Sequence, residues 1–178
     1  MATPASENDS KIVLMLISSL TGGFIAFVTA VLVEPIKLRI AERHNRTQLW
    51  TALYRELAAN YSVVEDLLTG QTNPGSPAPA YICKTMLYTE CYQAAQSQPL
   101  VFRREETAHW FEVIYRSFPE WKELTDGDTI RYYFTSWYHG VRGDLRRNRA
   151  LKRGLKHYLS KDERKALKLD MPPPSGLA

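Results

Sequence analysis

The 178-residue sequence is poor in the residues that build disulfide frameworks and metal sites, with two cysteines and four histidines. Cys83 and Cys91 would lie about 12 Å apart on one helix, which is too far for a disulfide bond. Two cysteines without a nearby histidine pair also do not make a zinc site. We therefore expect free thiols in a reducing compartment and no disulfide framework.

Complete catalytic motifs are missing as well, because the chain has no Gly-x-Ser-x-Gly turn and no glycine-rich phosphate loop. A di-iron bundle needs two Glu-x-x-His pairs and two further glutamates. The chain has one such pair, Glu106 and His109, with Glu56 and Glu90 as possible lone carboxylates. The sequence therefore predicts no catalytic residue, no metal ligand and no cofactor. A metal-binding helical bundle that uses Glu106 and His109 stays open as an alternative.

Segments with the alternating pattern of a β-strand are also lacking, and the soluble part is poor in valine and isoleucine. We find no internal repeat. The fold class that remains is all-α, with a single N-terminal transmembrane helix followed by a cytoplasmic bundle of about four helices.

One long apolar run stands out against these absences. Ile12–Val33 contains no charged residue, and 13 of its 22 residues are Leu, Ile, Val or Phe. A helix of this length spans about 33 Å, close to the roughly 30 Å hydrocarbon core of a bilayer. A signal peptide would have a shorter run behind a positive leader, whereas this leader carries Glu7 and Asp9. We predict a permanent transmembrane helix over residues 12–34, in preference to a cleaved signal or a buried soluble helix.

The flanking charges predict the orientation of this helix, because positively charged residues stay on the cytoplasmic side. Lys11 is the one cation in the leader, residues 1–11, which we therefore expect outside the membrane. Residues from Glu34 onward should be cytoplasmic, in a single-pass protein of a bacterial inner membrane. The cations that follow the run are Lys37, Arg39, Arg43 and Arg46.

Small residues form a ridge on the apolar run at a spacing of four: Ser18, Gly22, Ala26 and Ala30. Such ridges allow two transmembrane helices to approach closely. The ridge predicts a homo-oligomer, or contact with another membrane protein. The alternative is that small residues are simply tolerated in lipid.

The expected cytoplasmic domain covers residues 35–169, with an exposed Pro- and Gly-rich loop at 70–80 and a disordered tail at 170–178. Pro35 can begin a helix or kink a continuous one. Four main helices are predicted at 35–68, 81–96, 103–117 and from 128 onward, the last carrying Leu145, Leu151 and Leu155. Ser160–Glu163 fits a capping box before a short final helix. Expected core aromatics are Trp50, Tyr54, Tyr61, Tyr88, Trp110, Phe111, Tyr115, Phe134 and Trp137.

Positive charge is concentrated near the C-terminus, where residues 141–168 hold 11 Lys or Arg and three acids, a net charge of +8. This surface can be a solvated outer face, a contact for anionic membrane lipid, or a contact for an acidic protein. Nucleic-acid binding is possible but less favoured. The Arg-Gly-Asp tripeptide at 142–144 is attributed to chance. The expected basic surface residues are Arg146, Arg147, Arg149, Lys152, Arg153 and Lys156.

These observations favour a non-enzymatic interaction or scaffold protein held at the cytoplasmic face of a bacterial inner membrane. They do not identify the partner, because neither the ridge nor the basic surface specifies one.

Overall fold

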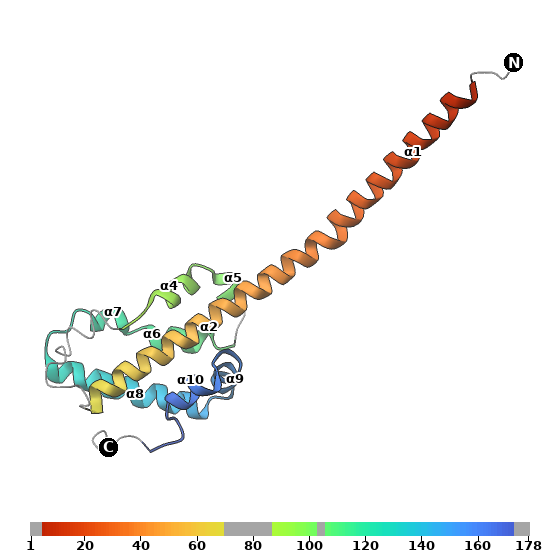
Figure 1. Ribbon diagram of the computed structural model, residues 1–178. Coiled ribbons are helices and arrows are strands. Elements are labelled where there is room, and N and C mark those ends of the chain that lie inside the picture. Colours follow the sequence, from red (N-terminus) through yellow and green to blue (C-terminus); the bar gives the residue numbers. More distant parts are fainter. Residues whose placement is uncertain (1–4, 70–86, 103–105, 173–178) are drawn as a thin grey trace. The chain divides into compact units, whose positions relative to one another are not determined.

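The computed structural model describes residues 5–69, 87–102 and 106–172 (Figure 1). These residues form helices joined by turns and contain no β-strand, which confirms the all-α class. The chain divides into two compact units, Met1–Asn45 and Arg46–Ala178. We call the second the folded unit.

The first unit is helical along its described length. Helix α1 covers Ala5–Val28, a π-helical segment η1 covers Thr29–Val33, and α2 covers Glu34–Thr69. The helical stretch from Ser10 to Thr69 contains a window that is long and apolar enough to cross a membrane, and none of that window is buried. A signal sequence would meet the same test of length and composition, so this observation supports a membrane-spanning helix without assigning its topology.

The π segment lies directly before Pro35, at the position where the sequence predicted either a helix start or a kink. In a regular α-helix the Pro35 ring would clash with the carbonyl group of Val31. The structure instead widens the preceding turn, and the Glu34 N–H donates to the carbonyl oxygen of Thr29, five residues earlier. The helix therefore continues through the proline.

The second half of α2 provides one wall of the core. The predicted helix at 35–68 is confirmed by α2 to within one residue at each end. From Trp50 onward its apolar side chains recur every three or four residues and are buried, as the period of a helix face requires. These residues are Trp50, Leu53, Tyr54, Leu57, Tyr61, Val64 and Leu68.

The other helices of the folded unit are shorter than predicted, so the bundle of four is not confirmed. Residues 87–89, inside the helix predicted at 81–96, are not helical, and residues 81–86 lie outside the described part. Short helices begin at Pro99 and Phe118, where the sequence predicted breaks. The helices after α2 are α4 (Glu90–Gln96), α5 (Pro99–Phe102), α6 (Ala108–Tyr115), α7 (Phe118–Trp121), α8 (Gly127–Arg147), α9 (Arg149–Tyr158) and α10 (Lys161–Ala166).

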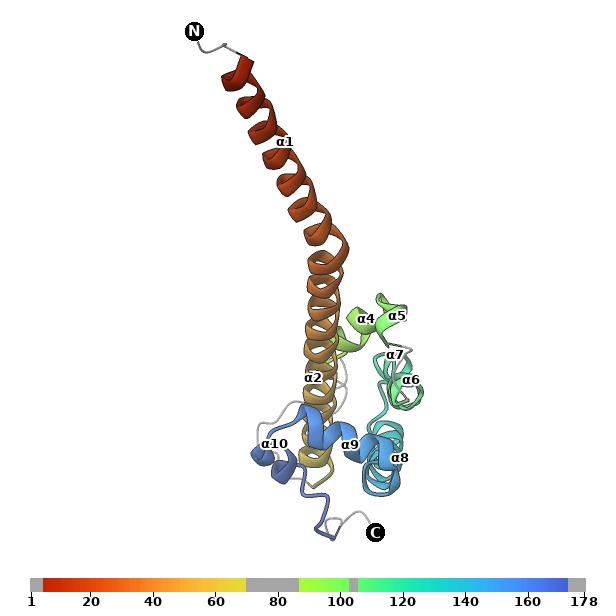
Figure 2. The same ribbon diagram turned by 90° about the vertical axis from the view of Figure 1, so that its right-hand side faces the viewer.

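The C-terminal part of the chain forms three consecutive helices, α8, α9 and α10, and α9 contacts both of the others (Figure 2). The sequence predicted one helix through Leu155, but Asn148 separates α8 from α9. Its backbone is extended, and its side-chain oxygen accepts from the N–H groups of Ala150 at 2.8 Å and Leu151 at 3.1 Å. This is the geometry of a helix N-cap, so Asn148 starts α9 in a new direction.

Removing this cap should destabilise the folded unit. We expect Asn148→Ala to lower the free energy of unfolding by about 1 kcal/mol, because two N–H groups at the start of α9 lose their acceptor. Urea unfolding followed by tryptophan fluorescence measures the change. Asn148→Ser is the matched control, since serine also caps helices, and it should cost less than half as much. Equal losses in both variants would contradict the capping role.

The next helix begins as predicted. Ser160 Oγ accepts from the Glu163 N–H at 3.2 Å, and Glu163 Oε2 accepts from the Ser160 N–H at 2.6 Å. These two bonds complete the predicted capping box. The bonds to Ser160 also lower the pKa of the Glu163 carboxyl group.

The core is as aromatic as predicted, with one exception among the expected residues. The prediction that Tyr88 is buried in the core is wrong, since 51% of its surface is exposed. The backbone of Tyr88, and not its ring, is what the fold holds, because its N–H donates to Asn60 Oδ1 at 2.8 Å. Trp110 is only partly buried. Buried aromatics that the sequence analysis did not identify are Tyr92, Phe102, Phe118, Trp121 and Tyr138.

Candidate functional site

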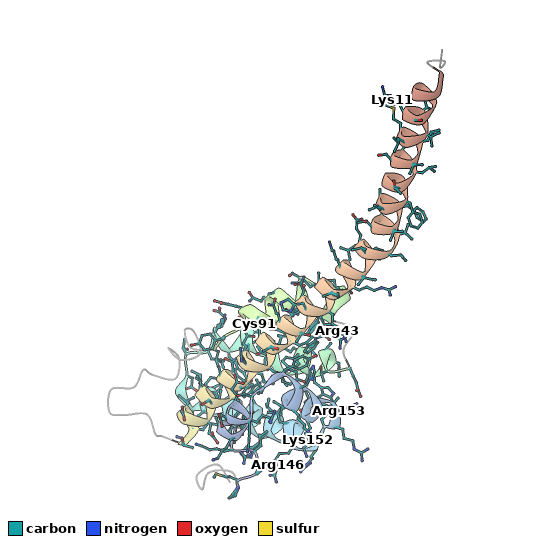
Figure 3. All side chains as sticks on the ribbon, turned by 45° about the vertical axis from the view of Figure 1, so that its right-hand side comes forward. Lys11, Arg43, Cys91, Arg146, Lys152 and Arg153 are labelled. Atoms are coloured by element: carbon teal, nitrogen blue, oxygen red, sulfur yellow. The ribbon has the colours of Figure 1, made fainter. Side chains whose placement is uncertain are left out.

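The basic surface lies on the last turn of α8 and along α9, which begins at Arg149. All six predicted cations are exposed, and Figure 3 shows Arg146, Lys152 and Arg153 on the outside of the folded unit. The apolar side of α9 faces inward, where Leu151 and Leu155 are buried. The surface therefore offers charge to a partner, whereas the leucines of α9 are already committed to the core.

Two hollows flank Arg146. The first is a cavity of about 390 Å³ lined by His139, Arg142, Gly143, Arg146 and Arg147. The second is a cavity of about 400 Å³ whose charged lining residues are Arg146, Lys152, Arg164 and Asp170. Among the described residues that line the first hollow, none is acidic. The structure thus brings Arg146, Arg147 and Lys152 together around concave surface.

The remaining predicted cations lie elsewhere on the surface. Arg149 and Lys156 line neither of these two hollows. Arg153 Nη2 donates to Glu106 Oε2 at 3.1 Å, and both side chains are largely exposed. Exposed pairs of this kind contribute little to stability. The six cations therefore do not form one uniform site.

Arg142, the first residue of the Arg-Gly-Asp tripeptide, is a buried arginine that lines the first hollow, and the sequence did not predict a role for it. Arg142 is only 4% exposed. Its Nη1 donates to the hydroxyl oxygens of Tyr61 and Tyr138, each at 2.8 Å. Its Nη2 donates to the carbonyl oxygens of Lys168, at 3.2 Å, and Met171. One side chain thus joins α2, α8 and the C-terminal turn, including Met171 in the segment predicted to be a disordered tail.

Glu65 supplies the negative charge of this buried cluster. Its Oε1 accepts from the Tyr138 hydroxyl at 2.9 Å and lies 4.0 Å from Arg142 Nη1. Its Oε2 lies 3.9 Å from Lys168 Nζ. Burial raises the pKa of Tyr138, and the neighbouring Tyr61 and Glu65 raise it further. Tyr138 therefore stays neutral and bridges the Arg142 cation to the Glu65 carboxylate, while Tyr61 accepts from Arg142 alone among these two charges.

Two more polar side chains of α2 organise the segment around α4. Asn60 Nδ2 donates to the Tyr88 carbonyl oxygen at 2.7 Å. Glu56 accepts from the N–H groups of Cys91, at 2.7 Å, and Tyr92, at 3.1 Å. A buried carboxylate from α2 thus caps the start of α4, a role that the α4 N-cap residue Thr89 does not fill with its own side chain.

Cys91, next to this cap, is a free thiol and is partly buried. Burial raises the pKa of the Cys91 thiol, and the charge of Glu56 raises it further. Both effects make the thiolate scarce, so Cys91 is not an activated nucleophile. Cys83 lies outside the described residues.

Among the described residues, no further metal ligand joins Glu106 and His109. Glu106 is engaged by Arg153 as described above, and the His109 ring lies 5.9 Å from the ring of Trp110, centroid to centroid. Within residues 5–69, 87–102 and 106–172, no group of three or more His, Cys, Asp or Glu side chains is arranged to hold a metal ion. Nothing in the described geometry favours the metal-binding alternative.

The small-residue ridge lies mostly on α1. Ser18, Gly22 and Ala26 belong to its regular α-helical part, whereas Ala30 falls in the π segment, where the spacing of four no longer repeats the same face. A methyl group added at Gly22 would meet no atom within 4 Å. The chain's own packing therefore does not require a glycine at this position.

Comparison with known proteins identifies no relative, since no family model, no curated protein and no solved structure matches the chain. The functional assignment rests on the residues and the geometry described above.

Proposed function

We propose that this chain is a single-pass, non-enzymatic interaction protein that holds its folded unit at the cytoplasmic face of a bacterial inner membrane. One observation carries the proposal. The apolar side chains of α1 are exposed, while the folded unit has a core of its own.

The exposed apolar surface of α1 needs a non-aqueous environment. Leu20 and Phe24 are 72% and 69% exposed, and the neighbouring apolar side chains are similar. Soluble monomers rarely expose contiguous apolar patches larger than a few hundred Å². The hydrocarbon of a bilayer covers such a helix along its whole length, and its backbone groups are satisfied within the helix.

The charged flanks support the proposed orientation. Lys37 and Arg39 follow the apolar run closely, and Lys11 alone precedes it in the leader. Cations of this kind are retained in the cytoplasm during insertion. The folded unit follows them in the chain, so the proposal places its basic surface in the cytoplasm as well.

Membrane extraction tests the anchor. We expect the full chain to remain in the membrane pellet after alkaline carbonate treatment, with a mass that includes residues 12–34. Protease added outside intact cells should leave the folded unit uncut. A chain released by carbonate, or one that has lost its apolar run by cleavage, would contradict the proposed anchor, and external digestion of the folded unit would contradict the orientation.

The proposed contact between anchors is tested on the ridge, with a second copy of the chain as the first candidate partner. Gly22→Ile should weaken association by about 1–2 kcal/mol, because the branched side chain blocks the close approach of a second helix. Leu20→Ile, on the opposite face, is the matched control and should change association by only a few tenths of a kcal/mol. Cross-linking in native membranes measures both. Equal cross-linking of the two variants would contradict the proposed contact through the ridge. A cross-linked band whose mass differs from that of a dimer would indicate that the partner is another membrane protein.

A further inference from the structure

Arg142 lines the first hollow and has one donor that the described part of the protein does not satisfy. The Nε of Arg142 is buried and has no hydrogen-bond partner among the described residues. Its two Nη atoms are fully engaged with phenols and carbonyl oxygens, so the guanidinium cannot turn to find another acceptor. A buried donor without an acceptor is costly. Because the Nε atom is closed off from solvent, an anion in the hollow would meet the positive charge of the Arg142 guanidinium and not this donor directly.

The rest of the hollow is built for the same charge. Arg146 and Arg147 line it, and no acidic residue does so among the described residues. Neither arginine makes a side-chain hydrogen bond or salt bridge within that part of the chain, although Arg147 interacts electrostatically with the Asp144 carboxylate. Arg142, one turn earlier, is fixed. Planar guanidinium groups match phosphate oxygens in a bidentate geometry. An anionic group with several oxygens, such as a phosphate ester, therefore suits the charge of this hollow.

We propose that this hollow binds the phosphate headgroup of an anionic phospholipid in the membrane that anchors the chain. The inference rests on the proposed function, because the anchor supplies the lipid. Only residues 34–49 separate the apolar run from Trp50. This short tether raises the effective concentration of membrane lipid that the folded unit meets.

The surface fits a headgroup better than it fits nucleic acid. Single-stranded nucleic acid is held by exposed aromatic rings on which bases stack. Neither hollow has a Phe, Tyr or Trp among its described lining residues, and the only aromatic ring there is the partly buried His139 of the first hollow. The leucines of α9 are buried, so the contact is electrostatic and needs no insertion into the bilayer.

The experiment measures binding of phosphatidylglycerol to the full chain in neutral detergent by native mass spectrometry, with phosphatidylcholine as the zwitterionic reference. Lys37 and Arg39 beside the apolar run would also attract anionic lipid, so both are first changed to glutamine. In this background we expect phosphatidylglycerol to bind in preference to phosphatidylcholine. Adding Arg146→Gln and Arg147→Gln should weaken that binding at least about tenfold, by the attraction of two cations near the surface.

A second pair provides the charge-matched control. Arg116 and Arg131 are exposed on other parts of the folded unit. Changing both to glutamine removes the same charge and should leave lipid binding within about twofold of the background variant. Equal weakening by the two pairs would mean that only net charge matters, and loss of all binding in the background variant would place the lipid at the anchor. Either result overturns the proposal.

Two further arms separate the sources of phosphate. Inorganic phosphate that binds the lipid-free chain with the same dependence on Arg146 and Arg147 would assign the hollow to a soluble phosphate. A DNA duplex that binds more tightly than phosphatidylglycerol with that dependence would assign it to nucleic acid. Each outcome overturns the lipid proposal. Failure of the carbonate test would instead remove the anchor, so the two proposals fail in distinguishable ways.

Discussion

Replacing Arg142 with methionine is expected to lower the free energy of unfolding of the folded unit by about 3–5 kcal/mol. The change leaves the buried Glu65 carboxylate with the half-exposed Lys168 ammonium, 3.9 Å away, in place of the buried cation 4.0 Å away, and it removes the donor to Tyr61 and Tyr138. Breaking a buried pair on one side costs this much, because the remaining charge stays in a poorly solvating environment. The turn that carries Lys168 also loses its tie to α8.

Thermal unfolding of the full chain in mild detergent, followed by tryptophan fluorescence, measures the loss. All four tryptophans lie at or after Trp50, so the signal reports the folded unit. Arg146→Met is the matched control: it removes the same charge from an exposed position one turn later, and should change stability by less than about 0.5 kcal/mol. Changing Glu65 to methionine in the Arg142→Met chain should recover part of the loss, since no buried charge then remains unpaired. Similar losses from Arg142→Met and Arg146→Met would refute the buried cluster as a source of stability.

Adding one methyl group at Gly154 is expected to destabilise the folded unit by about 3 kcal/mol. A Cβ atom there would lie 1.8 Å from the Tyr54 hydroxyl oxygen and 2.3 Å from Cζ of the same ring. Tyr54 cannot move aside, because its ring packs between Phe111 and Tyr158 at centroid distances of 5.1 and 5.3 Å. Overpacking of a filled core costs about 1–3 kcal/mol or more, and here the backbone of α9 must shift.

Gly140→Ala gives the opposite expectation and serves as the control. A Cβ atom at Gly140 meets nothing within 4 Å, so alanine adds only its better helix propensity, worth up to about 1 kcal/mol of stability. For a domain of this size, Gly154→Ala should lower the melting temperature by roughly 10 °C, while Gly140→Ala should leave it equal or higher. Tyr54→Phe should rescue Gly154→Ala only in part, because Cζ remains in place. A stable Gly154→Ala chain would show that α9 does not approach α2 so closely.

The features that the sequence predicted correctly are those with a local physical cause. Each of them depends on residues within one or two helical turns. They are the apolar N-terminal helix, the buried stripe of α2 from Trp50 to Leu68 and the capping box at Ser160. The short helices were missed because Pro99 and Pro119 were interpreted as breaks. Proline is favoured in the first turn of a helix, and both prolines occupy that position here.

The buried polar cluster was missed because its partners are far apart in sequence. Arg142 and Glu65 are 77 positions apart. A signal was nevertheless present: Arg142 follows Tyr138 by four residues and Glu65 follows Tyr61 by four, so each charge lies on the buried side of its own helix. Opposite charges on the inward faces of two helices predict a buried pair. The hollows beside Arg146 had no such signal, since they depend on how α8, α9 and the C-terminal turn pack.

The carboxylate of Glu56 couples the folding of α4 to that of α2. Helix α4 has seven residues, too few to hold together alone in water, and its first N–H groups are held by a side chain 35 residues earlier in the chain. α4 therefore has no independent folding equilibrium. We expect the amides of Cys91 and Tyr92 to exchange with solvent when the interface with α2 opens, so that this short segment unfolds together with the contacts that α2 makes to it.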